Sequence, residues 1–281
     1  MMGQCLRELR NLRLIDLSLP ISPNTAEPDP PKINYVDHRH AATELAAVAT
    51  HLVQKAYNGQ PHAPVITEEA FHDHMGLANE NLQLDSHAGT HMDAPWHFGP
   101  LSGDHPSKTI DQIPLEWCFG EGVVLDMRHK KPGETISPED LQAALARISY
   151  SLKPSDIVLL MTGADKHFSE PDYFSAHPGM GRDATLWLLD RGIKVIGIDA
   201  WGFDRPAGAM LKDYLQSRDN ASILPAHMVG RDREYCHIEK LGNLDLIPRP
   251  FGFWFCSFPV KIERGSAGWV RAVAMVEEGP R

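Results

Sequence analysis

The sequence is poor in cysteine, and its cysteines form no pattern. Only four of its 281 residues are cysteines, and no two of them have the C-x-x-C spacing of zinc-binding or redox motifs. Small secreted proteins depend on dense disulfide frameworks, so we expect reduced thiols and a cytoplasmic location instead. The four residues are Cys5, Cys118, Cys236 and Cys256.

Long apolar runs and an excess of basic charge are also missing. The N-terminal stretch lacks the apolar segment of a secretory signal peptide. No apolar run approaches the roughly 18–20 residues of a membrane-spanning helix. Asp and Glu number 37 against 27 Lys and Arg, which gives a formal net charge of −10. Acidic proteins are poorly suited to nucleic acid or anionic membranes, so we expect a soluble protein that binds neither.

The chain does have enough apolar residues for a large core, arranged in alternating strand and helix patterns. Hydrophobic residues make up 42% of it, so folding requires neither a disulfide nor a cofactor. The alternation is typical of α/β layers, and we predict one α/β domain over residues 1–281. We expect strands at 12–21, 120–129, 155–163, 193–200, 252–262 and 269–276, and helices at 40–57, 136–148 and 183–192.

Two finer expectations accompany these elements. Ser137 is predicted to cap the helix at 136–148, with Asp140 completing the cap. The last two strands of the chain are candidates for pairing with each other.

Histidine is frequent, and part of it gathers in one irregular segment. Three of the 15 histidines lie in LDSHAGTHMDAPWHF, residues 84–98. Gly89 and Pro95 disfavour a helix there, so we expect an open loop after a strand. In that loop Gly89 would let the backbone pass close to an ion. Other histidines are interpreted as surface residues, namely His38, His40, His51, His62, His72 and His74.

The spacing within this segment is typical of a metal site. His87 and His91 offer imidazole nitrogens and Asp93 a carboxylate, a mixed donor set that suits Zn²⁺ or Mn²⁺. His97 remains as a candidate acid/base beside the ion. A loop of solvated surface imidazoles is the alternative. A metal site also needs donors from elsewhere in the chain, and the best candidates, weak when taken alone, are His227 and Glu239.

The same residues carry a resemblance to a known family. HAGTHMDAPWH resembles the H-x-G-T-H-x-D-x-P-x-H signature of the cyclase family of metal-dependent hydrolases. That family includes kynurenine formamidases, isatin hydrolases and polyketide-associated cyclases. The resemblance continues through IDLSLPIS, HPG, GIDA, IEKLGNL and FPVKI, and so covers nearly the whole chain. It implies an α/β architecture with a swivelling β/β/α-like core, a small-molecule substrate, and a homodimer or higher homo-oligomer.

Individual roles also follow from the resemblance. It implies that His87, His91 and Asp93 are metal ligands and that His97 is the catalytic acid/base. Two further residues, His227 and Glu239, match the later ligands of the family. The resemblance implies that they complete a site for one or two Zn²⁺ or Mn²⁺ ions.

One departure from the family concerns the substrate. Kynurenine formamidases have a segment that resembles P-x-W-P-G-D in an early loop, and its Trp lines the pocket. This chain has NTAEPDPP instead, which places Glu27 near the position of that Trp. A carboxylate cannot stack on an aryl ring as an indole does, so we do not expect a kynurenine formamidase proper. Two later segments, DAWGFDRP and GRDREYCHIEKL, resemble members found beside secondary-metabolite genes. Further candidates for substrate contact, each equally compatible with a structural role, are Trp96, His177 and Trp201.

Three functions are compatible with these motifs. We predict hydrolysis of a carbon–nitrogen bond in a small aromatic or cyclic amide, a formamide or lactam, with His97 as acid/base to metal-activated water. The same metal and base also suit aldol or dehydrative ring closure, so a polyketide-type cyclase is the alternative. The third is a metal-stabilised binding protein without turnover. The intact His97 counts against it, because a structural metal site needs no spare base.

Overall fold

The computed structural model describes residues 12–58, 60 and 62–277. Contacts group the chain into two compact units, one of residues 31–84 and one that joins residues 1–30 to residues 85–281. Each unit is described by itself. The single domain expected over residues 1–281 stays a prediction, because this grouping reports contacts and not independent folding.

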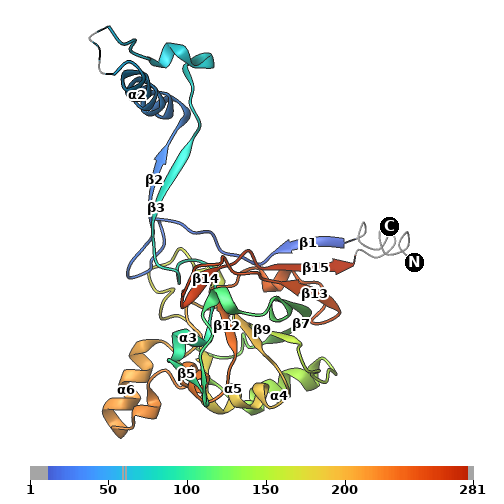
Figure 1. Cartoon of the computed structure of the whole chain (residues 1–281). Helices are drawn as coiled ribbons and strands as arrows, with labels where there is room; N and C mark the ends of the chain where they lie inside the picture. The colour runs from blue at the N-terminus through green and yellow to red at the C-terminus, as the bar shows by residue number, and fades with distance from the viewer. Residues whose placement is uncertain (1–11, 59, 61, 278–281) are drawn as a thin grey trace. The chain divides into compact units, whose positions relative to one another are not determined.

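The larger unit is built on a mixed sheet (Figure 1). Its order is β1 (Leu12–Asp16), β15 (Val273–Glu277), β13 (Phe253–Cys256), β7 (Phe119–Asp126), β9 (Ile157–Met161), β11 (Val195–Ile198), β12 (Cys236–Glu239), β4 (His91–Asp93) and β14 (Ala267–Trp269). Neighbours from β7 to β12 run parallel, and the other pairs are antiparallel. The expected pairing near the C-terminus is confirmed by β13 and β15.

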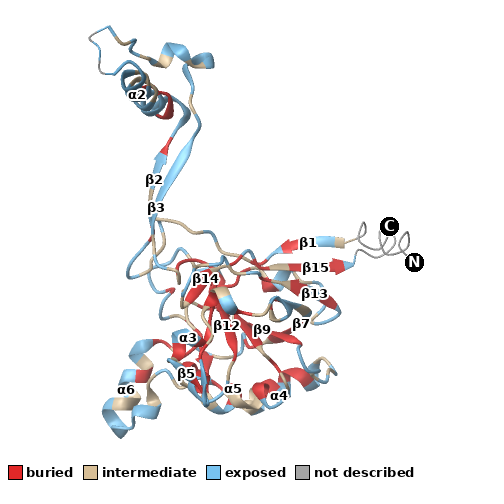
Figure 2. Cartoon of the chain, in the orientation of Figure 1, coloured by how far each residue is buried: buried red, intermediate tan, exposed pale blue. Residues whose placement is uncertain are grey.

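Both faces of this sheet are buried, which explains the continuous apolar runs of its central strands. Successive residues of β7 alternate between two cores. Val123 and Leu125 lie in the core that contains α4 (Pro138–Arg147) and α5 (Arg182–Leu189), and Val124 lies in the opposite one. Figure 2 shows buried residues along the sheet and along the inner sides of both helices. Each buried Val or Leu side chain contributes about 1.5–3 kcal/mol relative to exposure, so the sheet is a stable support.

The predicted cap of α4 is confirmed. The Ser137 hydroxyl accepts a hydrogen bond from the Asp140 N–H at 3.3 Å, and the Asp140 carboxylate accepts one from the Ser137 N–H at 2.8 Å. The expected helix at 183–192 is α5. Two further α-helices of this unit were not predicted, α3 (Pro95–Phe98) and α6 (Ala207–Ser217).

Short elements complete the larger unit. Its remaining strands are β5 (Leu101–Ser102), β6 (His105–Pro106), β8 (Thr135–Ile136) and β10 (Gly179–Met180). Its 3-10 helices are η3 (Ile110–Gln112), η4 (Leu115–Trp117), η5 (Ala164–His167), η6 (Asn220–Ser222), η7 (His227–Arg231) and η8 (Leu244–Leu246).

The smaller unit is a two-stranded ribbon that carries a helix. β2 (Lys32–Val36) pairs antiparallel with β3 (Asn79–Gln83), and α2 (His38–Ala56) lies between them in sequence with η1 (Glu68–Ala70) and η2 (His72–His74). The helix expected at 40–57 is thus confirmed. Buried residues are few here, namely Pro31, Val36, Ala41, Ala42 and Ala46, and the surface interpretation of the six outlying histidines is confirmed, since all six are exposed.

The expected loop at residues 84–98 is only partly correct. Residues 91–93 form β4 inside the main sheet, and residues 95–98 form the single turn α3 with Pro95 in its first turn. Pairing with β12 and β14 fixes the strand, which three residues alone do not specify. Proline is tolerated at a helix start because its missing N–H has no partner there.

The sequence analysis also predicted reduced cysteines and no membrane-spanning helix, and the described residues bear on both. Cys118, Cys236 and Cys256 are free thiols, while Cys5 and residues 1–11 around it lie outside the described residues. Across residues 12–277, apart from the undescribed positions 59 and 61, no helix is long and apolar enough to cross a membrane.

Candidate metal centre and pocket

The register between β4 and β12 brings together four ionisable side chains from distant parts of the chain. His237 lies directly opposite Asp93, and Glu239 lies opposite His91. Residues that face each other across antiparallel strands project to the same side of the sheet. The intervening residues of both strands project to the other side, into the apolar core. The sheet therefore presents two carboxylates and two imidazoles on one face, supported from behind by buried hydrocarbon.

A first group of imidazoles surrounds one oxygen of each carboxylate. His87 Nδ1 lies 2.8 Å and His91 Nε2 lies 3.3 Å from Asp93 Oδ1. His91 Nε2 is also 3.6 Å from Glu239 Oε2. We call these four side chains the first nest.

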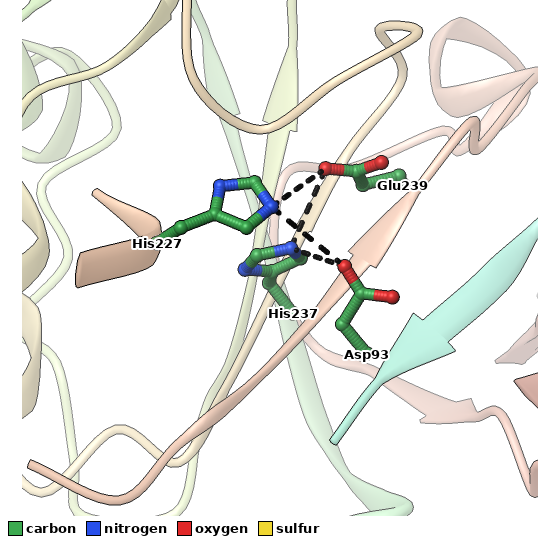
Figure 3. A group of neighbouring side chains, drawn as sticks. All are labelled: Asp93, His227, His237 and Glu239. Carbon is green, nitrogen blue, oxygen red and sulfur yellow. Dashed lines mark hydrogen bonds and ion pairs between the residues drawn. The ribbon is translucent and has the colours of Figure 1, made fainter. Parts of the chain in front are cut away.

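A second group surrounds the other oxygens of the same two carboxylates. His237 Nε2 lies 2.8 Å from Asp93 Oδ2 and 3.4 Å from Glu239 Oε1. His227, from η7, places Nε2 at 3.9 Å and 3.8 Å from the same two oxygens. Figure 3 shows these four side chains, the second nest, converging from β4, β12 and η7. Each of the two carboxylates thus places one oxygen in each nest.

Hydrogen bonds on the far side of the rings fix which nitrogen faces the carboxylates. The Nδ1 of His91 donates to the Gly89 carbonyl at 2.9 Å, and the Nδ1 of His227 donates to the Asp204 carboxylate at 2.5 Å. An oxygen that only accepts requires a proton on Nδ1, so Nε2 is the nitrogen that remains to bind an ion on the side of the carboxylates. Gly89 has a φ of +59°, which favours glycine. Gly89 therefore turns the chain and orients His91, while its expected approach to an ion stays a prediction.

The electrostatics of the nests keep both carboxylates ionised. Burial would raise the pKa of Asp93, but the neighbouring His91 and a hydrogen bond from His237 hold it well below its usual range. Burial likewise acts to raise the pKa of Glu239, whose hydrogen bond with His237 lowers it to about 2. In turn, burial acts to lower the pKa of His237, but these two carboxylates raise it to about 9. Ionised groups in an apolar interior require a cationic partner.

The residues present fit a divalent metal ion. Among the described residues, two buried atoms of the first nest, His91 Nε2 and Asp93 Oδ1, have no hydrogen-bond partner. Buried polar atoms without partners are rare and require an explanation such as an ion. The donors are nitrogens and carboxylate oxygens, as Zn²⁺ and Mn²⁺ prefer.

The nests open into a pocket of about 270 Å³. Three sequence candidates, His97, His177 and Trp201, line it beside the ligand residues. The pKa of His97 is lowered to about 4, chiefly by burial and further by the neighbouring histidines. His177 is buried, and its Nδ1 donates to the Pro178 carbonyl at 2.8 Å. The other residues lining the pocket are His87, Asp93, Gly202, Phe203, Asp204, Arg205, Pro206, Ala207, Leu224, His227, Glu239 and Lys240.

The two remaining substrate candidates lie outside this lining. Trp96 is 45% exposed and does not contact the pocket. Glu27 forms an ion pair with Lys240, whose Nζ is 2.8 Å from Glu27 Oε1. Lys240 itself lines the pocket and also donates to the His87 carbonyl at 3.0 Å. Glu27 therefore acts on the pocket only through Lys240.

The structure thus brings together every metal ligand that the sequence suggested and adds two residues that it did not. The five suggested ligands all contribute to the two nests. His237 was missed although CHIE is a strand in which His237 and Glu239, two apart, share a face. Asp204 was missed because its role depends on contact with His227, 23 residues later.

Comparison with known proteins identifies the family. A family profile described as "Putative cyclase" matches residues 15–205, more than half of the chain. The chain belongs to the cyclase family. Its relatives include the isatin hydrolase of Roseibium aggregatum, 28% identical over 206 residues that cover 69% of this chain and 73% of that protein. The kynurenine formamidase of Salinibacter ruber is 27% identical over 201 residues, covering 69% and 77%.

Solved structures of the family share the fold. The crystal structure of an isatin hydrolase bound to the product analogue thioisatinate matches with a TM-score of 0.73 at 21% identity, covering 99% of this chain and 97% of the other. The predicted α/β fold of this family is thereby confirmed. The prediction of a cyclase-family enzyme is also confirmed, and the relatives named above place the chain among hydrolases.

Proposed function

We propose that this hydrolase is metal-dependent and cleaves a carbon–nitrogen bond of a small aromatic or cyclic amide. The observation that carries the proposal is the buried cluster of carboxylates and imidazoles that opens into the pocket. The ions, one or two, would be Zn²⁺ or Mn²⁺. The residues that would hold them are His87, His91, Asp93, His227 and Glu239.

A divalent ion in the nests would supply Lewis acidity, which lowers the pKa of a water and polarises a carbonyl oxygen. The chain's own residues move the proton. His97 faces the pocket with its Nε2 3.8 Å from Asp93 Oδ2, and its lowered pKa leaves it unprotonated at neutral pH. His97 accepts the proton of the attacking water and delivers it to the leaving nitrogen.

The proposed substrate class has two supports. The two relatives are named for isatin and for kynurenine formamide chemistry, both of which concern aromatic amides. The pocket also has an apolar portion, to which Trp201 and Leu224 contribute. An indole and an aliphatic side chain suit a flat apolar ring, while the nests take its polar amide.

Beside the nests, the pocket is bordered by a buried ion pair between Lys240 and Glu27 and not by an additional aromatic ring, which affects the choice of substrate. The side chains of Lys240 and Glu27 are 4% and 8% exposed, and the Lys240 ammonium lies 5.3 Å from the centre of the Trp201 ring. Removing one partner of a buried ion pair lowers the stability of a protein by about 3–5 kcal/mol, because the other charge is left buried without a partner. The Glu27 carboxylate is therefore held by Lys240 and presents no surface for stacking. We infer that N-formylkynurenine is not the preferred substrate.

The test combines metal analysis with a turnover screen. Protein purified without chelators should contain Zn²⁺ or Mn²⁺ by elemental analysis. It should split formanilides into an aniline and formate, or open the ring of isatin or lactones with a mass gain of one water. Asp93→Ala should lose the metal and the activity while circular dichroism shows a folded core, because Asp93 belongs to neither of the two apolar cores. Bound metal with ring closure and no gain of water would favour the cyclase. Bound metal without turnover of any substrate would favour a binding protein.

We also propose that the chain self-associates through α2. Leu45, Val48 and Leu52 are 37%, 56% and 60% exposed and lie at helical spacing along one stripe. A two-stranded ribbon with so few buried residues is marginal by itself, and a second copy would cover the stripe. Light scattering should show a dimer or larger oligomer that Leu52→Lys dissociates and Gln54→Lys, on another side of α2, does not. A wild-type monomer at all accessible concentrations contradicts the proposal.

A further inference from the structure

We propose that His237 is a metal ligand that completes a second cation position in this chain. The position would consist of two imidazoles and two shared carboxylates, His227, His237, Asp93 and Glu239, and would take a divalent ion such as Zn²⁺ or Mn²⁺. The inference rests on the proposed metal-dependent function and extends it, because His237 is absent from the five ligands that the family resemblance implies.

The backbone gives His237 no other direction in which to point. It lies on β12 between two core residues, Cys236 and Ile238, which are fully buried on the opposite face. Its own side chain is also fully buried, and it faces Asp93 directly across the strand pair. A polar ring in that place must find its partners inside the nests.

The hydrogen bonds of the ring leave its inner nitrogen as a donor atom for a cation. His237 Nδ1 lies 3.3 Å from the Tyr235 hydroxyl, which itself donates to the Ala226 carbonyl at 2.9 Å. The hydroxyl oxygen is therefore free only to accept, so Nδ1 carries a proton and donates it. Nε2, which hydrogen-bonds to Asp93 at 2.8 Å, is the nitrogen that faces both carboxylates, and it would become the donor atom when an ion replaces its proton. This is the arrangement in which a histidine ligand is held by a hydrogen bond on its far side.

Aromatic packing fixes the plane of the ring. His237 stacks on Phe203 at a centroid distance of 4.3 Å and an angle of 16°, and Phe98 lies 5.1 Å away on a tilted plane. The Phe203 N–H also donates to Glu239 Oε1 at 2.7 Å. One residue thus holds both the imidazole and the carboxylate that would share the ion. Such fixed geometry lowers the cost of assembling a site.

The spacing of the four donor atoms fits a tetrahedral ion. Metal–ligand bonds of about 2.1 Å imply donor atoms about 3.4 Å apart along the edges of a tetrahedron. The nitrogen–oxygen distances of the second nest are 2.8 Å and 3.4 Å for His237 and 3.9 Å and 3.8 Å for His227. These values bracket the expected edge. Without His237 the position would keep only three protein donors.

The metal content of matched variants tests the inference. Metal-free protein is titrated with Zn²⁺, freed of excess ion and analysed for zinc per chain. We expect two ions in the wild type and one in His237→Phe, which keeps a ring against Phe203 but removes the nitrogen donor. His177→Phe replaces another buried pocket histidine and should keep two. Visible spectra of the Co²⁺-loaded proteins should show one cobalt environment fewer in His237→Phe than in the other two.

The outcomes separate this inference from the function on which it rests. A wild type that binds no zinc overturns both. A wild type that binds one zinc and still hydrolyses its substrate overturns only the inference, and leaves His237 as a hydrogen-bond partner of Asp93. Two ions in both the wild type and the folded His237→Phe variant overturn it as well. Should His237→Phe fail to fold, His237→Gln takes its place, and the wild-type count of one or two ions decides if both fail.

Discussion

The Asp204 carboxylate accepts a hydrogen bond from Nδ1 of His227 at 2.5 Å, and it also accepts the backbone N–H groups of Ala226 and His227. One buried carboxylate therefore fixes both the start of η7 and the ring that η7 presents to the nests. Residues that hold a metal-binding histidine in this way are worth about 10–100-fold in metal affinity.

Asp204→Asn should weaken Zn²⁺ binding by about that factor while the protein remains folded. The amide can donate as well as accept, so it no longer selects the ring form with its proton on Nδ1. Competition with a chromogenic chelator measures the affinity. Asp213→Asn, which removes a carboxylate that pairs with Arg205 near the pocket, is the control and should bind zinc as the wild type does. Equal affinity in all three proteins would show that Asp204 does not support the site.

His97→Asn should retain the metal and lose turnover by a factor of about 10²–10⁴, which corresponds to roughly 3–5 kcal/mol of activation free energy. The reason is that the proposed ligands are complete without His97, whereas proton transfer to the leaving nitrogen is not. Steady-state rates and zinc content are measured on the same sample. Parallel loss of zinc and activity would instead make His97 a ligand, and His177 would become the first candidate for the proton transfer.

Turnover of N-formylkynurenine should be weak, with kcat/KM below about 10⁴ M⁻¹s⁻¹, the lower end of the ordinary enzyme range. The resemblance to kynurenine formamidases places Glu27 near the position of their Trp, and the ion pair that Glu27 forms with Lys240 offers no face to an aryl ketone. Absorbance at the product band measures the rate. A value in the ordinary range would restore the kynurenine formamidase assignment that Glu27 argues against.

Asp140→Asn should lower the free energy of unfolding at pH 7 by about 1 kcal/mol, the usual worth of a helix cap. Burial acts to raise the pKa of Asp140, but the Ser137 N–H and the Lys130 ammonium lower it to about 2. The stabilisation by this carboxylate is thus present above the unfolded pKa of about 3.9 and is lost as the pH falls toward 2. Urea unfolding from pH 7 to pH 2.5 should show the two proteins converging. A constant difference across that range contradicts the assigned pKa.

The sequence predicts best where the pattern is local. Apolar runs such as 155–163 and the cap at Ser137 depend on neighbours within a few residues, and both were found where expected. The ligands His87, His91 and Asp93 were also accessible, because their spacing within one segment is itself distinctive. The structure places them together with His227 and Glu239, as the family resemblance implied.

The parts that could not be predicted depend on long-range pairing. β4 has only three residues, and it is a strand because β12 and β14 flank it. The proposed role of His237 depends on Asp93, the residue opposite it on β4. Asp204 and Lys240 similarly act through contacts with His227 and Glu27, which are separated from them by 23 and 213 residues. No pattern along the chain specifies such encounters.

The alternation along β4 has a consequence for how the chain finds its native pairing. A slip of one residue between β4 and β12 would turn His91 and Asp93 into the hydrocarbon core and bring Met92 to the pocket. The misaligned chain would hold two charged or polar groups in apolar surroundings and would have nothing with which to bind an ion. An ion that binds only the correct alignment stabilises it by mass action. A bound cation would therefore favour the native alignment of β4, and the residues proposed to hold it would also stabilise the correct pairing of the sheet.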